Sequence, residues 1–342
     1  MPDDTHDRRS DAPSPSASTV TVESGARLHF GFGNLSLAHE RLYGAVGVGL
    51  DAPRVRLRVA PADAVESDHD AAREYAARAC DLLDVDGARV AVESELPRHM
   101  GLGSGTQLAL ATLAGVARAH GRDPRVRERA PALGRGGRSG IGVATFEAGG
   151  FVLDAGHPTG RFTTDRPADG DWTVPAVAAR HRVPDDWRFL LVIPEADPGR
   201  AGDAEDSAIR RAVEDADPAV ADRVAGAIQR RLLPAVAEGS AERFGAAVEE
   251  IGRLNGAWFA DEQGGVYRPP VGDIVAEVGD DPAVYGAGQS SWGPVVYGVT
   301  DADRAETARE AGEDALAAAG VAGDVRVVRP RNSGADIRPA EE

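Results

Sequence analysis

The 342-residue sequence contains no lysine, so all 38 of its basic residues are arginine. Walker-type phosphate loops need a lysine amine that reaches the terminal phosphates, and Schiff-base enzymes need one as the nucleophile. Both chemistries are therefore excluded. The formal net charge of −17 repels nucleic-acid phosphates and anionic lipids at long range, so we expect no nucleic-acid partner and no membrane partner.

Cysteine and long apolar runs are also scarce. The single cysteine, Cys80, excludes an internal disulfide and a multi-cysteine zinc site, and its place in an amphipathic stretch at 70–83 indicates core packing. No apolar run approaches the roughly 20 residues that span a bilayer, and the first residues lack a hydrophobic segment. We expect a cytoplasmic protein.

What is abundant is acid and glycine. Asp and Glu number 55, glycine numbers 41, and arginine is the sole cation. This composition is typical of proteins that stay soluble in concentrated salt, where charge repulsion is screened. It predicts a halophilic source, with GC-rich coding as the alternative reason for the missing lysine.

The order of periodic segments predicts an α+β protein with two lobes. Residues 1–18 and 330–342 are expected to be polar tails, the first lobe to span 19–193 and the second 194–329. Alternating strands are predicted near 20–30 and 55–59, joined by a glycine-rich stretch at 31–49, and a helical hairpin broken at Gly239 is predicted over 218–254. The acidic segment 199–216 is predicted to be a mobile lid.

The clearest motif, Leu-Pro-Arg-His-Met-Gly-Leu-Gly-Ser-Gly-Thr-Gln, occupies 96–107 between a strand and a buried helix at 106–120. Small residues let backbone N–H groups point at one spot, and a helix N-terminus adds partial positive charge, which together bind an anion without lysine. A plain helix-capping turn is the alternative. The expected phosphate or diphosphate ligands are Gly101, Gly103, Ser104, Gly105 and Thr106.

This motif resembles the phosphate loop of the superfamily of galactokinase, homoserine kinase, mevalonate kinase and phosphomevalonate kinase. Two further segments resemble that superfamily in the right order: Ala-Arg-Leu-His-Phe-Gly-Phe-Gly-Asn at 26–34 and Gly-Ala-Gly-Gln-Ser-Ser-Trp-Gly-Pro at 286–294. The resemblance implies an N-terminal lobe like ribosomal protein S5 domain 2 and a ferredoxin-like C-terminal lobe. It also implies Mg²⁺, held by the hydroxyls of Ser104 and Thr106.

Kinases of this superfamily carry a Ser-Gly-x-Asp pattern whose Asp orients or deprotonates the attacking hydroxyl. Here Ser139-Gly140-Ile141 is followed by Gly142, so that carboxylate is missing. Losing such a group typically costs about 10²-fold to 10⁴-fold in rate. The segments Arg-Gly-Gly-Arg-Ser-Gly-Ile-Gly and Gly-Gln-Ser-Ser-Trp-Gly-Pro instead resemble the non-kinase β-ribofuranosylaminobenzene 5'-phosphate synthases.

That resemblance implies condensation of phosphoribosyl diphosphate with 4-aminobenzoate or 4-hydroxybenzoate, releasing carbon dioxide and diphosphate, in methanopterin-type cofactor biosynthesis. No general base is obligatory, because carbon dioxide leaves where a proton otherwise would. The resemblance also implies a homodimer. An ATP-dependent small-molecule kinase and a non-catalytic phosphate-ligand binder of the same fold remain the alternatives.

The remaining site residues follow from the same resemblance. Arg27 and His29 lie two residues apart on a strand, so both can face the cleft, and with Arg138 they are the expected catalytic residues; a surface salt bridge is the alternative for Arg27. Asn34 stands where related synthases are expected to carry Asp, and a turn-forming role is its alternative. Ser139 and Gly140 are expected to bind phosphate, and the expected substrate ligands are Asn34, Gly288, Gln289, Ser290 and Ser291.

Overall fold

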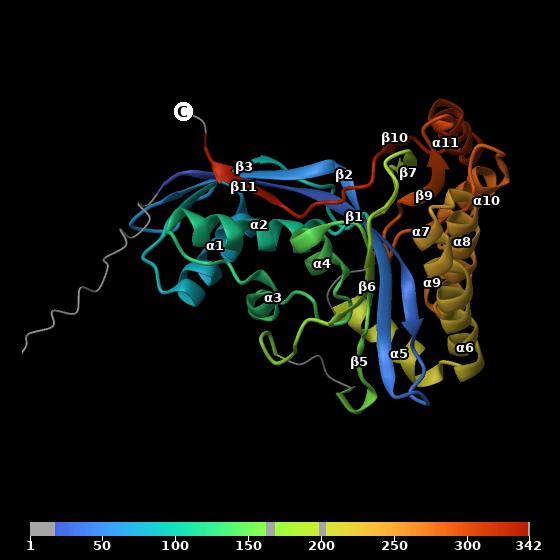
Figure 1. Cartoon of the computed structure of the whole chain (residues 1–342), viewed down its shortest axis with the longest axis horizontal. Coiled ribbons are helices and arrows are strands. Elements are labelled where there is room, and N and C mark those ends of the chain that lie inside the picture. Colours follow the sequence, from blue (N-terminus) through green and yellow to red (C-terminus); the bar gives the residue numbers. More distant parts are fainter. Residues whose placement is uncertain (1–17, 162–167, 198–202, 341–342) are drawn as a thin grey trace, which may run out of the picture.

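The computed structural model describes residues 18–161, 168–197 and 203–340, which form two lobes around two antiparallel sheets (Figure 1). Within these ranges no helix combines the length and apolar character of a membrane span. The predicted α+β architecture is confirmed. Residues 1–17, most of the expected first tail, lie outside the described ranges.

The N-terminal lobe is built on a long β-hairpin. Its seven strands run in the order β11-β1-β2-β4-β6, with β3 and β5 also pairing with β2. The strands are β1 (Val20–Asn34), β2 (Arg41–Pro61), β3 (Ala88–Ser94), β4 (Phe151–Asp154), β5 (His157–Pro158), β6 (Val177–His181) and β11 (Asp336–Pro339). The helices of this lobe are α1 (Asp70–Leu83), α2 (Ser104–Ala119), α3 (Val126–Arg129) and α4 (Ile141–Ala148).

The second lobe has a four-stranded sheet in the order β10-β7-β9-β8. Numbered from β7 along the chain this is 4-1-3-2, the strand order of a ferredoxin-like fold, as expected. The strands are β7 (Trp187–Pro194), β8 (Ala287–Gln289), β9 (Val296–Asp301) and β10 (Gly323–Val328). The helices are α5 (Asp203–Asp215), α6 (Pro218–Ala227), α7 (Leu233–Glu238), α8 (Ala241–Trp258), α9 (Ala260–Gln263), α10 (Val271–Asp280) and α11 (Ala305–Ala319), with a π-helical turn at Ile228–Leu232 between α6 and α7.

The glycine-rich stretch 31–49 was expected to be a connection, but it belongs to the hairpin: β1 continues to Asn34 and β2 starts at Arg41. The strand tolerates this because the register shifts between His29 and Gly31, where Gly31 has φ 146°. Asn255 of α8 covers the irregularity, since its amide oxygen accepts from the Phe32 N–H at 2.7 Å and its amide nitrogen donates to the Phe32 carbonyl at 2.9 Å. The bulge interrupts the alternating pattern of the strand, so the sequence does not show that β1 continues past His29.

Two predicted boundaries are wrong. Strand β7, Trp187–Pro194, pairs with β9 and β10, so the second lobe begins before residue 194. The stretch 330–342 is not a polar tail, because β11 pairs antiparallel with β1 and returns the chain to the first lobe. The outer edge of β1 offers unpaired backbone groups over Val20–Glu23, and a short polar strand satisfies them.

The acidic segment 199–216 is largely helical. Residues 198–202 lie outside the described ranges, but α5 packs Ala208, Ile209, Ala212 and Val213 into a buried cluster with β1 and β2 residues. Four apolar side chains at helical spacing are enough to anchor this helix against the hairpin, which the acidic composition concealed. The prediction of a mobile lid is therefore not supported over 203–215.

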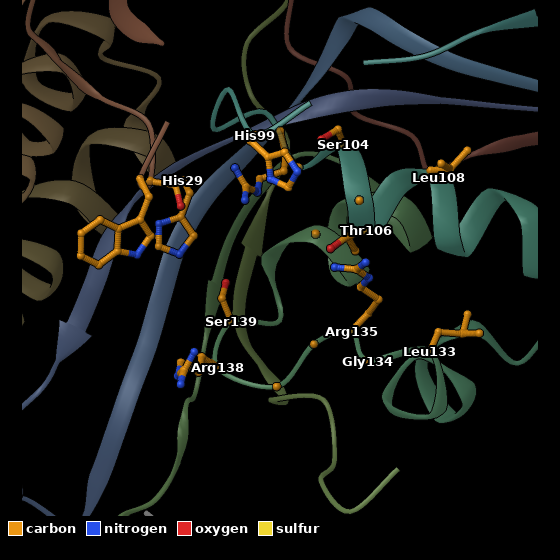
Figure 2. A pocket seen from close by; sticks show the side chains of 18 of the residues that line it. His29, His99, Ser104, Thr106, Leu108, Leu133, Gly134, Arg135, Arg138 and Ser139 are labelled. Atoms are coloured by element: carbon orange, nitrogen blue, oxygen red, sulfur yellow. The ribbon is translucent and has the colours of Figure 1, made fainter. Parts of the chain in front are cut away.

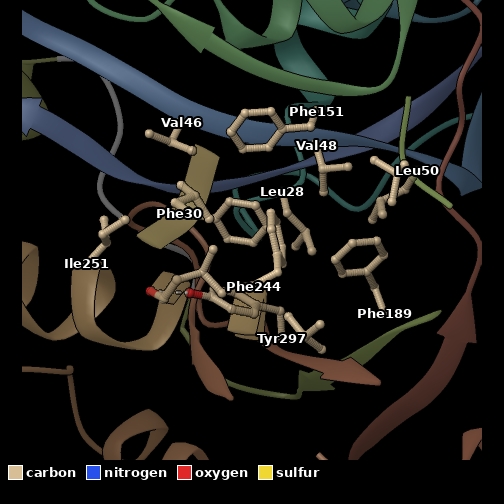
Figure 3. Close-up of a cluster of buried hydrophobic side chains, with 14 of the residues drawn as sticks. Leu28, Phe30, Val46, Val48, Leu50, Phe151, Phe189, Phe244, Ile251 and Tyr297 are labelled. Carbon is tan, nitrogen blue, oxygen red and sulfur yellow. Dashed lines mark hydrogen bonds between the residues drawn. The ribbon is translucent and has the colours of Figure 1, made fainter. Parts of the chain in front are cut away.

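The two lobes share one core (Figure 3). Phe244 of α8 is its centre: its ring centroid lies 5.7 Å from that of Phe30, 5.9 Å from Phe151 and 4.9 Å from Trp187. These partners come from β1, β4 and β7, so both sheets contact a single helix. Burying such rings fixes the relative position of the lobes and hence of any site between them.

Candidate active site

A cavity of about 1100 Å³ opens along the first turn of α2 (Figure 2). Its walls come from β1, β2, α1, the loop before α2, the 134–142 loop, α5 and the glycine-rich loop after β8. The segments with motif character at 26–34, 96–107, 134–142 and 286–294 thus all reach this cavity, together with two helices that carry no motif, α1 and α5. Segments nearly 270 residues apart in sequence thus meet at one hollow.

The predicted phosphate loop lines this cavity with Gly101, Gly103, Ser104, Gly105 and Thr106. Gly103 is the N-cap of α2 with φ 84°, and its carbonyl accepts from the N–H groups of Thr106 and Gln107. No side chain caps the helix and its first turn carries no acidic residue. The N-terminal partial charge of α2 is therefore directed into the cavity.

Arg27 and His29 both line the cavity, while Leu28 and Phe30 between and beyond them join the shared core. The Arg27 guanidinium donates to the Gly101 carbonyl at 2.6 Å, and a Cβ added to Gly103 would lie 3.0 Å from Arg27 Cγ. Arg27 thus lies along the phosphate loop.

His29 is buried, and burial together with the nearby Arg27 charge lowers its pKa to about 3. Its ring is therefore neutral at physiological pH. The ring packs edge-on against Phe32 with centroids 5.1 Å apart. A neutral imidazole in this position can form a hydrogen bond but adds no positive charge to the cavity.

The 134–142 loop presents Arg138 and Ser139 to the cavity (Figure 2). Arg138 is paired with Asp206 of α5 at 2.5 Å, and its positive charge counteracts the burial that raises the pKa of the Tyr43 hydroxyl. Both charged side chains are mostly shielded from solvent, with 27% and 16% of their surfaces exposed. A carboxylate from a distant helix therefore competes for the cation that the sequence assigned to catalysis.

Gly140 does not line the cavity, contrary to its prediction as a phosphate ligand. Its N–H donates to the buried Asp154 carboxylate at 2.7 Å, and that carboxylate also accepts from Ala45 at 3.0 Å and Gly156 at 2.9 Å. Burial raises the pKa of Asp154 to about 6 against the effect of these three N–H groups. Asp154 thus ties the loop to two strands, a structural role consistent with its strand-end position.

Gly142 occupies the position that carries Asp in the related kinases. It lines the cavity, and a Cβ added there would lie 3.0 Å from Thr106 Cγ2 and 3.6 Å from Thr106 Oγ1. A side chain at this position would point at Thr106 on the first turn of α2. The chain instead has no carboxylate at this point, and α4 packs closely on α2.

The glycine-rich loop after β8 contributes less than expected. Ser291, Trp292 and Gly293 line the cavity, but Gly288, Gln289 and Ser290 do not. Gly288 is needed because a Cβ would lie 2.6 Å from the Tyr297 hydroxyl, and Gln289 donates to the Ser291 carbonyl at 3.1 Å. These residues support the loop through buried contacts.

Asn34 is also not among the residues that line the cavity. Its side chain bonds the backbone of Ser36 at both 2.9 and 2.7 Å and donates to the Arg41 carbonyl at 2.6 Å, which closes the turn between β1 and β2. The turn-forming alternative is the one the structure supports.

Sequence reasoning missed several residues that the cavity contains, notably Tyr43 and Asp206. Backbone strain gives one further signal: three non-glycine residues on the cavity wall, Tyr43, His99 and Ser291, have positive φ values of 72°, 57° and 56°. Such strain gathers at functional sites. It is not readable from composition.

The site suits a partial Mg²⁺ coordination sphere only. Across the described ranges no group of three or more His, Cys, Asp or Glu side chains is arranged to hold a metal ion. Mg²⁺ bound with phosphates needs only one or two protein oxygens besides phosphate oxygens and water. The hydroxyls of Ser104 and Thr106 on the cavity wall fit that requirement.

Comparison with known proteins agrees with this geometry. Residues 69–150 match the family described as the GHMP kinases N terminal domain, and residues 232–318 match the GHMP kinases C terminal family. β-Ribofuranosylphenol 5'-phosphate synthase of Methanothermobacter thermautotrophicus is 34% identical over 82% of this chain and 89% of its own length. The protein of the same name from Archaeoglobus fulgidus is 30% identical over 93% of this chain and 99% of its own.

Among solved structures, homoserine kinase from Cytophaga hutchinsonii superposes with a TM-score of 0.68 at 16% identity, covering 94% of this chain and 98% of that one. At this level of identity the similarity establishes the fold alone. The GHMP-type two-lobe fold expected from the three motifs is confirmed.

Proposed function

Because the chain belongs to the β-ribofuranosylphenol 5'-phosphate synthase family of the GHMP kinase fold, we propose that it catalyses decarboxylating phosphoribosyl transfer. The donor is phosphoribosyl diphosphate and the acceptor is 4-hydroxybenzoate or 4-aminobenzoate. The observation that carries the proposal is the uncapped N-terminus of α2 in the cavity, with Gly142 facing Thr106 where a kinase has its carboxylate.

The reaction balances without a proton acceptor for the aromatic carbon. The bond from ribose C1 to the diphosphate oxygen breaks and its electron pair leaves with diphosphate. The ring carbon that bears the carboxylate bonds to C1, and the ring-to-carboxylate bond then breaks, returning its electron pair to the ring as carbon dioxide leaves. The catalytic demands are to stabilise the leaving anion and to hold C1 close to the ring carbon.

The residues of the phosphate loop meet the first demand. The N–H groups at the start of α2 and the Arg27 guanidinium lie along the wall that would receive diphosphate. Mg²⁺, held by the hydroxyls of Ser104 and Thr106, would supply further neutralisation of the diphosphate charge. The absence of an acidic residue in the first turn of α2 leaves the partial positive charge of the helix N-terminus unopposed within that turn.

The opposite wall suits the sugar and the acceptor. His29 is neutral, so it can contact the ribose without repelling the positive charge that develops at C1. Arg138 is positioned with Tyr43 for an anionic substituent, either the acceptor carboxylate or the 5'-phosphate. Ser139 and Ser291 supply neutral donors on either side.

One experiment separates this function from its alternatives. Purified protein in concentrated KCl is incubated with Mg²⁺, phosphoribosyl diphosphate and each benzoate, and carbon dioxide and diphosphate are both quantified. We expect a one-to-one release that requires the benzoate. Diphosphate release without carbon dioxide, or turnover of ATP with a small alcohol substrate, would reject the proposal in favour of hydrolysis or kinase activity.

The proposal includes a cytoplasmic homodimer acting in methanopterin-type cofactor synthesis. The single cysteine in 342 residues is consistent with a reducing compartment. Analytical ultracentrifugation at high salt tests the dimer, and cell fractionation tests the location.

A further inference from the structure

Two arginines lie against the two inner glycines of the phosphate loop. Arg27 reaches Gly103 from β1, and Arg135 reaches Gly105 from the 134–142 loop. A Cβ added to Gly105 would lie 3.2 Å from Arg135 Nη1 and 3.3 Å from both Cζ and Nη2, so the guanidinium rests directly on the first turn of α2. Figure 2 shows Arg135 extending toward Thr106 on the cavity wall.

Arg135 is held in this position by three separate elements. Its Nη2 donates to the Tyr75 hydroxyl of α1, and its guanidinium carbon lies 5.4 Å from the centroid of the Tyr75 ring. Its own backbone N–H donates to the Ala130 carbonyl at 2.9 Å, while Trp172 Nε1 donates to its carbonyl at 3.0 Å. A rotamer-rich side chain that is fixed in advance loses little entropy when it binds a ligand.

Arg135 has no ion-pair partner within the described part of the chain, although the carboxylates of Glu74, Asp169 and Asp171 line the same cavity. No described carboxylate lies within 4.0 Å of its guanidinium nitrogens, whereas Arg138, three positions later in the same cavity, is paired with Asp206 at 2.5 Å. Its buried Nε has no hydrogen-bond partner among the described residues. A fixed cation with no described ion-pair partner beside a helix N-terminus, in a protein of net charge −17, indicates a site for an anion.

We propose that Arg135, oriented by Tyr75, is the second arginine of the diphosphate site and grips the leaving group from the side opposite Arg27. This assignment rests on the proposed function. It makes the 134–142 loop the carrier of two arginines with different tasks: Arg135 binds the leaving diphosphate and Arg138 binds another anionic part of the substrates. A planar guanidinium can offer paired N–H donors to two phosphate oxygens, which replaces the lysine that the chain lacks.

The competing explanation is structural: the contact between Arg135 and Tyr75 braces α1 against the loop. Direct binding of inorganic diphosphate with Mg²⁺, measured by calorimetry in concentrated KCl, separates the two. We expect Arg135→Gln to weaken diphosphate binding at least about tenfold, the size expected for a charge-assisted hydrogen bond. Arg135→Lys retains the charge but loses the paired N–H donors of the guanidinium, so its diphosphate affinity should lie between those of the wild type and Arg135→Gln.

Two further variants sharpen the test. Tyr75→Phe keeps the ring and removes the hydroxyl that orients the guanidinium, so we expect about a threefold loss of diphosphate affinity. Gly105→Ala should displace the guanidinium, and combining it with Arg135→Gln should add little to Arg135→Gln alone, because both changes act on one contact. Arg73→Gln, an exposed arginine on the same helix as Tyr75, is the matched control and should bind diphosphate as the wild type does.

The outcomes are distinct. Unchanged diphosphate affinity in Arg135→Gln, or a wild-type protein that does not bind diphosphate, overturns the assignment; a lowered Tm with unchanged affinity identifies a structural brace. If the wild type binds diphosphate through Arg135 but no benzoate yields carbon dioxide, the proposed function fails and the anion site stands. In the active enzyme, Arg135→Gln should raise KM for phosphoribosyl diphosphate and leave KM for the benzoate unchanged.

Discussion

The hydroxyl of Ser290 donates a 2.7 Å hydrogen bond to the carbonyl of Gly101, so a residue of the second lobe holds the phosphate loop of the first. The same hydroxyl accepts from the His29 N–H at 3.2 Å. A Cβ on Gly101 would lie 2.1 Å from the Ser290 carbonyl, which shows how closely the two loops approach. The site is therefore assembled only when both lobes are folded against each other.

We expect Ser290→Ala to lower the free energy of unfolding by about 1–3 kcal/mol, because it removes the hydroxyl that accepts from the buried His29 N–H and one of the two hydrogen bonds to the Gly101 carbonyl. Chemical unfolding at high salt measures this. Ser94→Ala removes a comparable 3.1 Å bond to a carbonyl on the surface and should change the free energy by less than about 0.5 kcal/mol. Equal effects in the two variants would contradict a bridging role for Ser290.

The ion pair of Arg138 with Asp206 indicates that the Asp206 carboxylate competes with an anionic group of the substrate for Arg138. Asp206→Asn removes the competing charge, so we expect KM to fall several-fold for the substrate whose anion Arg138 binds. Steady-state kinetics with each substrate varied in turn will show which one it is. Glu262→Gln, which breaks the ion pair of Arg211 on the same helix, controls for loosening of α5 and should leave both KM values unchanged.

The raised pKa of the Asp154 carboxyl predicts that kcat/KM decreases on the acid side of its pH profile. Its pKa is raised to about 6, so below that pH its carboxyl gains a proton and at least one of its three N–H bonds is weakened. We expect kcat/KM to fall as pH drops through about 6. Asp154→Asn should be at least about tenfold less active at pH 8, because the loop is displaced, and should lose this limb.

Asp51→Asn is the control for Asp154, since Asp51 also accepts from a backbone N–H, that of Arg329 at 2.9 Å, but on the surface. Its pH profile should match the wild type. An acid limb that persists unchanged in Asp154→Asn would assign the titration to another group.

Because His29 is buried in its neutral form, we expect the free energy of unfolding to depend on pH. Its folded pKa of about 3 lies below the 6.5 of a solvent-exposed histidine, so between these values the unfolded chain binds a proton that the folded chain does not. The stabilisation is complete above about 6.5 and is lost as pH falls toward 3, at up to about 1.4 kcal/mol per pH unit. From pH 6.5 to 5 the wild type should lose about 2 kcal/mol more than His29→Gln in urea unfolding. Parallel pH dependences in the two proteins would show that His29 is not buried as neutral imidazole.

The net charge of −17 predicts that salt stabilises the fold. Screening at molar KCl shortens the Debye length to about 3 Å and weakens both the overall repulsion and the surface ion pairs. Exposed pairs are worth at most about 1 kcal/mol each, so we expect repulsion to dominate and Tm to rise from 0.1 to 2 M KCl. Sorbitol at matched osmolarity controls for effects unrelated to charge, and a Tm that falls with KCl would show that the ion pairs dominate.

Local signals predicted the elements well. The helix at Asp70–Leu83 has the predicted bounds, and the 96–107 segment forms a loop that enters a buried helix. Such features depend on periodicity and on glycine placement within a dozen residues. Arg27 and His29 line the same cavity, as predicted, because residues two positions apart on a strand point to the same face of the sheet.

Features that depend on distant partners were missed. Asn34 was assigned to substrate but closes a turn, and the residues after 330 pair with β1, a strand some 300 residues earlier in the chain. Asp206 enters the cavity from a helix whose acidic composition suggested a loose segment. No local sequence pattern shows that the residues after 330 pair with the edge of β1, or that Asp206 pairs with Arg138.

The sequence by itself determined the kind of chemistry: without lysine, and with glycines leading into a buried helix, an anion must be bound by backbone N–H groups and arginine. Only the tertiary structure decided which arginines do so. Arg135 and Arg138 are nearly identical in local sequence, yet one rests on Gly105 without a described carboxylate and the other is paired with Asp206. The electrostatic energy of a charge depends on its neighbours in space, and folding selects those neighbours.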